Sequence, residues 1–186
     1  MKSNYDIETL ESEIMEKQKL LAKLKRESPR ESVSDYTLKG IKGPVKLSTL
    51  FDHKQDLIII HNMGIGCKYC TLWADGFNGL LDHLKNRAAF AVVSPDGPLV
   101  QQNFARERGW KFDMYSGEDS TFIEDMGFKS EIGWMPGVST FTMSADGKIF
   151  RVAHAVFGPY DPFNSIWHLF ALLSEGINEW KPRFHY

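Results

Sequence analysis

The sequence lacks several features that would assign it to a class of function. It has no run of about 18 consecutive apolar residues, so no transmembrane helix and no membrane partner is predicted. Its charged start has no apolar segment typical of a signal peptide, so we expect no secretory leader. The 22 Lys and Arg residues are balanced by 24 Asp and Glu residues, which gives no reason to expect nucleic-acid binding.

Cysteine is also scarce, with two residues among 186. Two cysteines cannot build the disulfide framework of a small secreted domain, so we expect a cytoplasmic protein. The two are nevertheless only three residues apart, as Cys67-Lys68-Tyr69-Cys70, a spacing that random placement would give only about 1% of the time. This pair is the strongest chemical signal in the chain.

The order of apolar runs indicates a layered α/β fold. Continuous β-branched and apolar runs at 57–60 and 89–93 are typical of buried strands, and a helical pattern follows each of them. An Asp-Gly turn between alternating runs predicts an antiparallel hairpin over 138–152. We therefore expect one domain over 29–186, built on a central mixed sheet flanked by helices.

An N-terminal helical arm, residues 1–28, is expected to precede this domain. The helix is predicted over 5–27 and ends at Ser28-Pro29. One interpretation lays the helix across its own domain, and the other makes it a dimerising arm that gives a homodimer, with Lys17 interrupting the seam. The apolar positions at helical spacing are Ile7, Leu10, Ile14, Leu21 and Leu24.

The cysteine pair is predicted to start a helix directly after the first buried strand and its loop. A thiol reacts as its thiolate, and the free N–H groups at a helix N-terminus stabilise that charge. Cys67 falls where the helix should begin, with Lys68 as a nearby cation, so we expect Cys67 to be the nucleophile. Cys70, one turn further in, should be more buried and should act as the resolving thiol.

The strand, loop and CxxC helix together resemble the active-site segment of thioredoxin-like proteins. Thioredoxins carry a buried ionisable acid six residues before the first cysteine, and His61 stands at that offset here. The resemblance implies that His61 takes the proton of Cys70 during exchange. A core histidine with a structural hydrogen bond is the other interpretation.

A second resemblance is carried by His61-Asn62-Met63, the run from Gly66 to Gly79, and Arg108-Gly109-Trp110. These segments look like a bacterial thioredoxin-like family catalogued as domain of unknown function 899. The resemblance covers roughly 29–186 and implies a thioredoxin-like fold, but it brings no established reaction. Val138 stands where many thioredoxin relatives have a cis-proline facing the disulfide, so we expect a trans peptide bond there.

Four side chains are expected to face a substrate. Lys68 and Tyr69 lie between the cysteines, where Tyr69 would alter access to Cys67. Val138 takes the place of the proline. Trp134 is expected near the cysteine loop, where it either contributes to a peptide-binding surface or packs into the core.

The leading functional hypothesis is thiol–disulfide exchange on a disulfide-containing protein or a small thiol, with no cofactor. A different class is a non-catalytic binding or scaffold protein, or a metal-handling protein that would use Cys67, Cys70 and His154. A thiol peroxidase is a further alternative, although neither cysteine follows the Pro-x-x-x-Thr/Ser-x-x-Cys run that peroxiredoxins carry.

Overall fold

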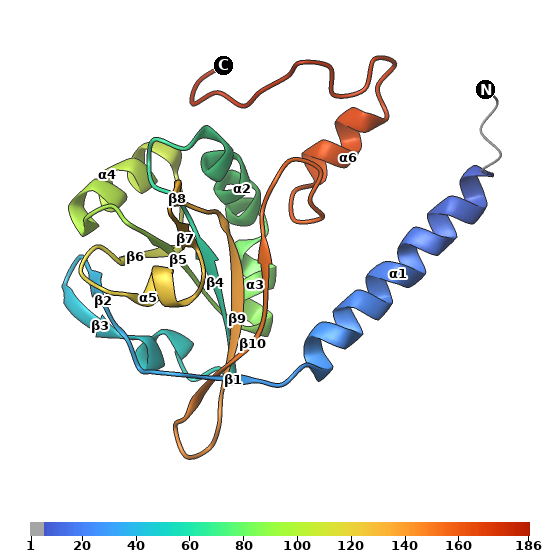
Figure 1. Ribbon diagram of the computed structural model, residues 1–186. Coiled ribbons are helices and arrows are strands. Elements are labelled where there is room, and N and C mark those ends of the chain that lie inside the picture. The colour runs from blue at the N-terminus through green and yellow to red at the C-terminus, as the bar shows by residue number, and fades with distance from the viewer. Residues whose placement is uncertain (1–5) are drawn as a thin grey trace.

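The structure, a computed structural model, describes residues 6–186 (Figure 1). Within these residues eight strands form one mixed sheet in the order β1-β10-β9-β4-β5-β6-β2-β3. The central strand β4 pairs in parallel with β5 and antiparallel with β9, as the buried run at 57–60 predicts. The strands are β1 (Glu31–Val33), β2 (Thr37–Gly40), β3 (Gly43–Lys46), β4 (Asp56–His61), β5 (Ala89–Ser94), β6 (Asp113–Ser116), β9 (Gly137–Met143) and β10 (Ile149–Val156).

Helices and short elements cover both faces of this sheet. One face packs against α2 (Lys68–Gly79), α3 (Leu81–Arg87) and α4 (Pro98–Arg108). The other packs against the 3-10 helix η1 (Leu47–Phe51) and α5 (Phe122–Asp125). A two-stranded hairpin, β7 (Lys129–Ser130) and β8 (Gly133–Trp134), lies after α5, and α6 (Ser165–Ala171) follows β10.

Side chains of β4 divide between the two cores as a pleated strand requires. Leu57 and Ile59 join the core on the η1 and α5 side, whereas Ile60 joins the core under α2. The expected central mixed sheet flanked by helices is therefore confirmed. Helix α6 ends at Ala171, and the chain continues from there in a series of turns.

The N-terminal arm does not lie across its own domain. Helix α1 (Ile7–Glu27) begins at Asp6, which caps it, and leaves the body of the molecule with none of its residues buried (Figure 1). Its base is held where the Lys25 Nζ donates to the carbonyl of His154, at 3.1 Å. The interpretation that lays this helix on the domain is wrong, because none of its residues is buried and its large apolar side chains are exposed. No helix within residues 6–186 is long and apolar enough to cross a membrane.

Candidate active site

The cysteine pair sits at the N-terminus of α2, at the carboxyl end of the central strand β4. Cys67 is the N-cap residue, with extended backbone, and its Sγ accepts the backbone N–H of Cys70 at 3.0 Å. Cys67 is half-buried, whereas Cys70 is only 3% exposed. The predicted start of the helix and the deeper position of the second thiol are both confirmed.

The two thiols differ in pKa because Cys70 donates a hydrogen bond to the Cys67 sulfur, which accepts it. The hydrogen bond from the Cys70 thiol, and to a lesser degree the backbone N–H groups of Cys70 and Tyr69, together lower the pKa of Cys67 from 9.0 to about 7 against the effect of burial. Donating that same hydrogen bond, together with burial, raises the pKa of Cys70. Cys67 is thus the thiolate near neutral pH and Cys70 stays protonated.

Lys68 does not contribute to this effect. Its Nζ lies 5.8 Å from the ring centroid of Phe184, in the C-terminal segment, and it is not among the causes of the lowered Cys67 pKa. The expectation that Lys68 supplies a cation to the nucleophile is therefore wrong. Backbone and thiol donors stabilise the thiolate instead.

The loop that delivers Cys67 is held by groups that sequence reasoning missed. Asn62 donates its backbone N–H to the carbonyl of Val93 and accepts the N–H of Gly64 at 2.8 Å through its side chain. Asp96 Oδ2 accepts the N–H of Ile65 at 2.9 Å. Since β4 and β5 are parallel neighbours, the loops after them meet at one edge of the sheet, and this topology is the signal that could have identified Asp96.

Helix α2 is fixed at its middle by Asp75. This carboxylate accepts the indole N–H of Trp110 at 2.8 Å and forms an ion pair with Arg108. Arg108 also donates to the carbonyl of Phe184 at 2.6 Å, so the C-terminal segment returns to the α2 and α4 side of the domain. These contacts make α2 a rigid support for the two thiols.

His61 ends β4 inside the core on the α5 side of the sheet. The ring is 1% exposed, lies 3.9 Å from the Phe128 ring in a stacked arrangement, and its Nε2 is 2.9 Å from the Ser139 hydroxyl. Burial, together with the charges of Arg151 and His154, holds its pKa well below 6.5, so the ring is neutral. Among the described residues its hydrogen-bond partner is Ser139 and not a cysteine.

The other predicted substrate-facing residues occupy different places. Tyr69 is half-buried in an aromatic cluster with Trp73 and Trp167, next to the thiols. Val138 follows the first residue of β9 and pairs with Ile60, and no cis peptide bond occurs within residues 6–186. Trp134 packs against the core on the α5 side, beneath the Nζ of Lys129.

The structure does not bring His154 to the cysteines. His154 is exposed on β10, with its carbonyl bonded to Lys25 of the arm. Within residues 6–186 no group of three or more His, Cys, Asp or Glu side chains is arranged to hold a metal ion. The metal site of Cys67, Cys70 and His154 is therefore not formed.

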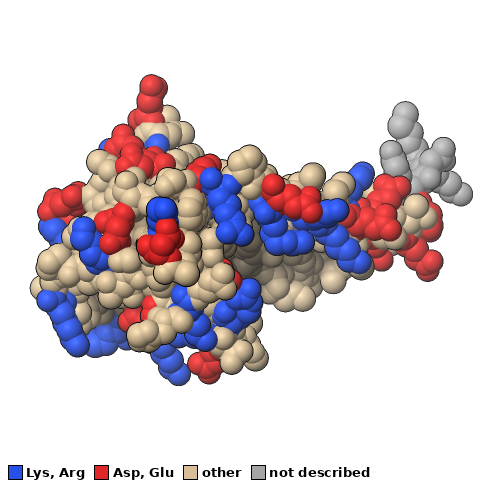
Figure 2. Space-filling model, turned by 90° about the horizontal axis from the view of Figure 1, so that it is seen from below, with Lys and Arg blue, Asp and Glu red and all other residues tan. Residues whose placement is uncertain are grey.

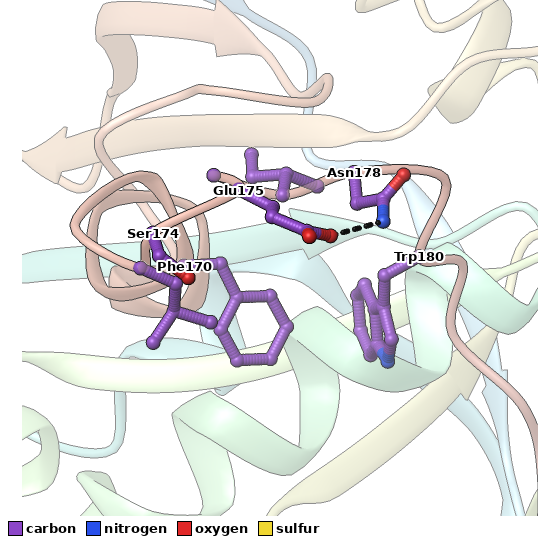
Figure 3. A pocket seen from close by; sticks show the side chains of 8 residues that line it. Phe170, Ser174, Glu175, Asn178 and Trp180 are labelled. Atoms are coloured by element: carbon purple, nitrogen blue, oxygen red, sulfur yellow. Dashed lines mark hydrogen bonds between the residues drawn. The ribbon is translucent and has the colours of Figure 1, made fainter.

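A separate pocket lies between the end of α6 and the turns that follow it, and it does not include the thiols. It has a volume of about 390 Å³, and within it the Asn178 side chain donates to Glu175 at 3.2 Å (Figure 3). Its lining residues are Phe170, Leu173, Ser174, Glu175, Gly176, Ile177, Asn178 and Trp180.

Comparison with known families and structures agrees with this fold. The family model described as "Bacterial protein of unknown function (DUF899)" matches residues 7–185, and so includes the arm that the expected range of 29–186 omits. No curated protein matches the chain significantly.

Among solved structures, the chain is similar to Mycobacterium tuberculosis peroxidoxin BcpB, with 23% identity, a TM-score of 0.56, and coverage of 68% of this chain and 84% of the other. It is also similar to Vibrio vulnificus Prx3, solved reduced and in complex with hydrogen peroxide, with 16% identity, a TM-score of 0.56, and coverage of 72% and 87%. A peroxiredoxin-like protein from Aquifex aeolicus gives 14% identity, a TM-score of 0.52, and coverage of 68% and 73%. These likenesses confirm the thioredoxin-like fold.

Proposed function

This chain belongs to the bacterial DUF899 family, and we propose that its Cys67–Cys70 pair makes it a thiol–disulfide oxidoreductase. One observation carries the proposal: at the N-terminus of α2, the Cys67 Sγ accepts the Cys70 backbone N–H at 3.0 Å, beside a second, buried thiol. This arrangement lowers the pKa of Cys67 to about 7 and raises that of Cys70. A nucleophile with a pKa near the ambient pH is the most effective attacking thiol.

The reaction proceeds in two exchanges. The Cys67 thiolate attacks one sulfur of a substrate disulfide, a mixed disulfide forms, and the other substrate sulfur leaves as a thiolate that takes a proton from water. Cys70 then loses its proton and attacks the Cys67 Sγ, which forms the Cys67–Cys70 disulfide and releases the second substrate thiol. The substrate gains two electrons and the protein loses two, so a reducing compartment such as the cytoplasm would favour the reductase direction.

The second exchange requires a base for the Cys70 proton. His61 is our proposal for that base because it stands at the offset of the thioredoxin acid; since burial lowers its pKa, it would pass the proton on and not keep it. The Nδ1 of His61 has no hydrogen-bond partner within residues 6–186, whereas Nε2 is engaged by Ser139. The base acts on Cys70 only, so replacing His61 should slow the second exchange and leave the first unchanged.

A thiol peroxidase is the second candidate, and the likeness of the fold to peroxiredoxins favours it. The Cys67 thiolate would attack a peroxide oxygen, giving Cys67 sulfenic acid and releasing water or an alcohol. Cys70 would then attack the sulfenic sulfur, forming the same disulfide and releasing water. Both reactions use the same thiols, so they differ in the oxidant and not in the site.

Trapping experiments test the proposal and separate the two candidates. Cys70→Ser should accumulate mixed disulfides through Cys67 when it is incubated with a disulfide substrate, and Cys67→Ser should accumulate none. Wild-type protein should reduce a model disulfide such as oxidised glutathione or insulin with dithiothreitol as electron donor. Consumption of hydrogen peroxide without disulfide reduction would replace the leading proposal by the peroxidase.

A further inference from the structure

Helix α1 carries an apolar stripe that nothing else covers in the part of the chain that the structure describes. The helix is 21 residues long, which corresponds to about 31 Å, and none of its side chains is buried. Its large apolar side chains are between 41% and 74% exposed. A stripe of this length on a helix that leaves the domain is a surface for a partner. These side chains are Ile7, Leu10, Ile14, Met15, Leu20, Leu21 and Leu24.

The charges along the same helix indicate which partner covers the stripe. Residues 6–16 contain five acidic side chains and no basic one, whereas residues 17–26 contain five basic side chains and no acidic one. Figure 2 shows this division, with red side chains gathered at the outer end of the arm and blue ones toward the body. A second copy laid antiparallel places each acidic half beside a basic half, while a parallel copy places like charges together.

We propose that α1 pairs with α1 of a second copy of this chain in an antiparallel two-helix interface. The heptad spacing fixes the register, because apolar residues at alternating spacings of three and four form the seam. In the register that aligns both seams, Ile7 meets Leu24 of the second copy and Leu10 meets Leu21. The arrangement is its own image under a two-fold axis, as a homodimer requires.

Lys17 is the exception in the seam. In the proposed register it lies opposite Ile14 of the second copy, and in the structure its Nζ is 3.9 Å from the Glu13 carboxylate of its own helix. A lysine at a seam position lowers the affinity, but its charged end can reach solvent past the seam. Three heptads with one charged layer form a short interface, so we expect a dissociation constant on the order of micromolar.

Two charge-reversed full-length variants test the pairing. One changes Glu8, Glu11 and Glu16 to Lys, and the other changes Lys19, Lys23 and Arg26 to Glu. Sedimentation velocity from about 1 to 100 μM should show wild-type dimers, monomers for each variant alone, and dimers again when the variants are mixed in equal amounts. Recovery in the mixture excludes loss of the helix as the cause. A wild-type chain that stays monomeric, or a mixture that stays monomeric, would overturn the proposal.

Lys17→Leu tests the seam in the opposite direction. Lys17 is exposed on an isolated arm, so its replacement should not change the thermal unfolding of the domain. In the dimer it replaces a charge with an apolar side chain, and the dissociation constant should fall by about tenfold. An unchanged dissociation constant would show that the dimer, if present, uses another surface.

The orientation of the two helices is tested by cross-linking. In a background that lacks Cys67 and Cys70, Ile7→Cys chains are mixed with Leu24→Cys chains and oxidised. Disulfides should join one chain of each kind, and Ile7→Cys chains alone should form few. Efficient cross-linking of Ile7→Cys to itself would overturn the antiparallel arrangement.

Discussion

Removing the Cys70 side chain should raise the pKa of Cys67, because the hydrogen bond from that thiol is the largest cause of its lowered value. At a pKa of about 7, half of Cys67 is ionised at pH 7, whereas a thiol of pKa 9 would be about 1% ionised. The gain in thiolate is about 50-fold. The intrinsic nucleophilicity of a thiolate falls as the thiol pKa falls, with a Brønsted slope of about 0.4–0.5. Over two pKa units this lowers the rate about 8-fold, so the net gain in the rate of attack is about 6-fold.

The assay is the rate of alkylation by iodoacetamide as a function of pH, with the labelled cysteine identified by mass spectrometry. Wild-type protein should show a midpoint near pH 7 at Cys67. Cys70→Ala should raise this midpoint by about one unit or more, and Cys70→Ser by less, because the serine hydroxyl still donates a hydrogen bond.

Lys68→Gln is the matched control, because the Lys68 ammonium lies against Phe184 and does not contribute to the Cys67 pKa. It should leave the midpoint unchanged. A wild-type midpoint above pH 8, or a midpoint that moves with Lys68 and not with Cys70, would refute the hydrogen-bond explanation.

Three further predictions concern the groups around the thiols. Burial keeps the folded-state pKa of His61 well below its unfolded value of about 6.5, so the unfolded state gains a proton first as the pH falls. The free energy of unfolding, measured by urea titration, should therefore drop by about 1 kcal/mol between pH 6.5 and 5.5. The drop should be smaller in His61→Gln. Gly64→Ala should lower the free energy of unfolding by about 1–3 kcal/mol and slow the alkylation of Cys67. The reason is that Gly64 has φ +108° and that a Cβ there would lie 3.0 Å from the Asp96 carboxylate. Gly66→Ala, with open space at its Cβ, is the control and should change neither quantity. Asp75→Asn should lower the free energy of unfolding by about 1–3 kcal/mol, because it breaks the ion pair with Arg108. Asp82→Asn, at an exposed position of α3, should have little effect. Equal effects of the two substitutions would contradict the anchoring role of Asp75.

The central part of the fold could be predicted because its physical signals are local. A strand buried on both faces reads as a continuous apolar run, which locates β4 and β5, and an Asp-Gly turn locates the β9–β10 hairpin. Strand β1 could not be found in this way. It is a three-residue edge strand whose formation depends on pairing with β10, more than 100 residues later in the chain.

The candidate site also has features that local sequence predicts and features that only distant contacts determine. The position of Cys67 at a helix start and the burial of Cys70 follow from a spacing of three residues within one turn. The direction of the Lys68 side chain depends on Phe184, and the support of the preceding loop depends on Asp96, so both are set by contacts between distant segments. The sequence therefore predicts which of the two thiols has the lower pKa, but not what lowers it.

The source of the lowered Cys67 pKa bears on the reduction potential of the cysteine pair. If a lysine stabilised the thiolate, the Cys67 pKa would depend on one exposed side chain and on salt. Here it depends on the hydrogen bond from Cys70 and on two backbone N–H groups of α2. Oxidation to the disulfide removes the Cys70 thiol as a donor, so the stabilisation of a Cys67 thiolate exists only in the reduced protein. The hydrogen bond from Cys70 thus stabilises the reduced form, and this should make the Cys67–Cys70 disulfide a stronger oxidant.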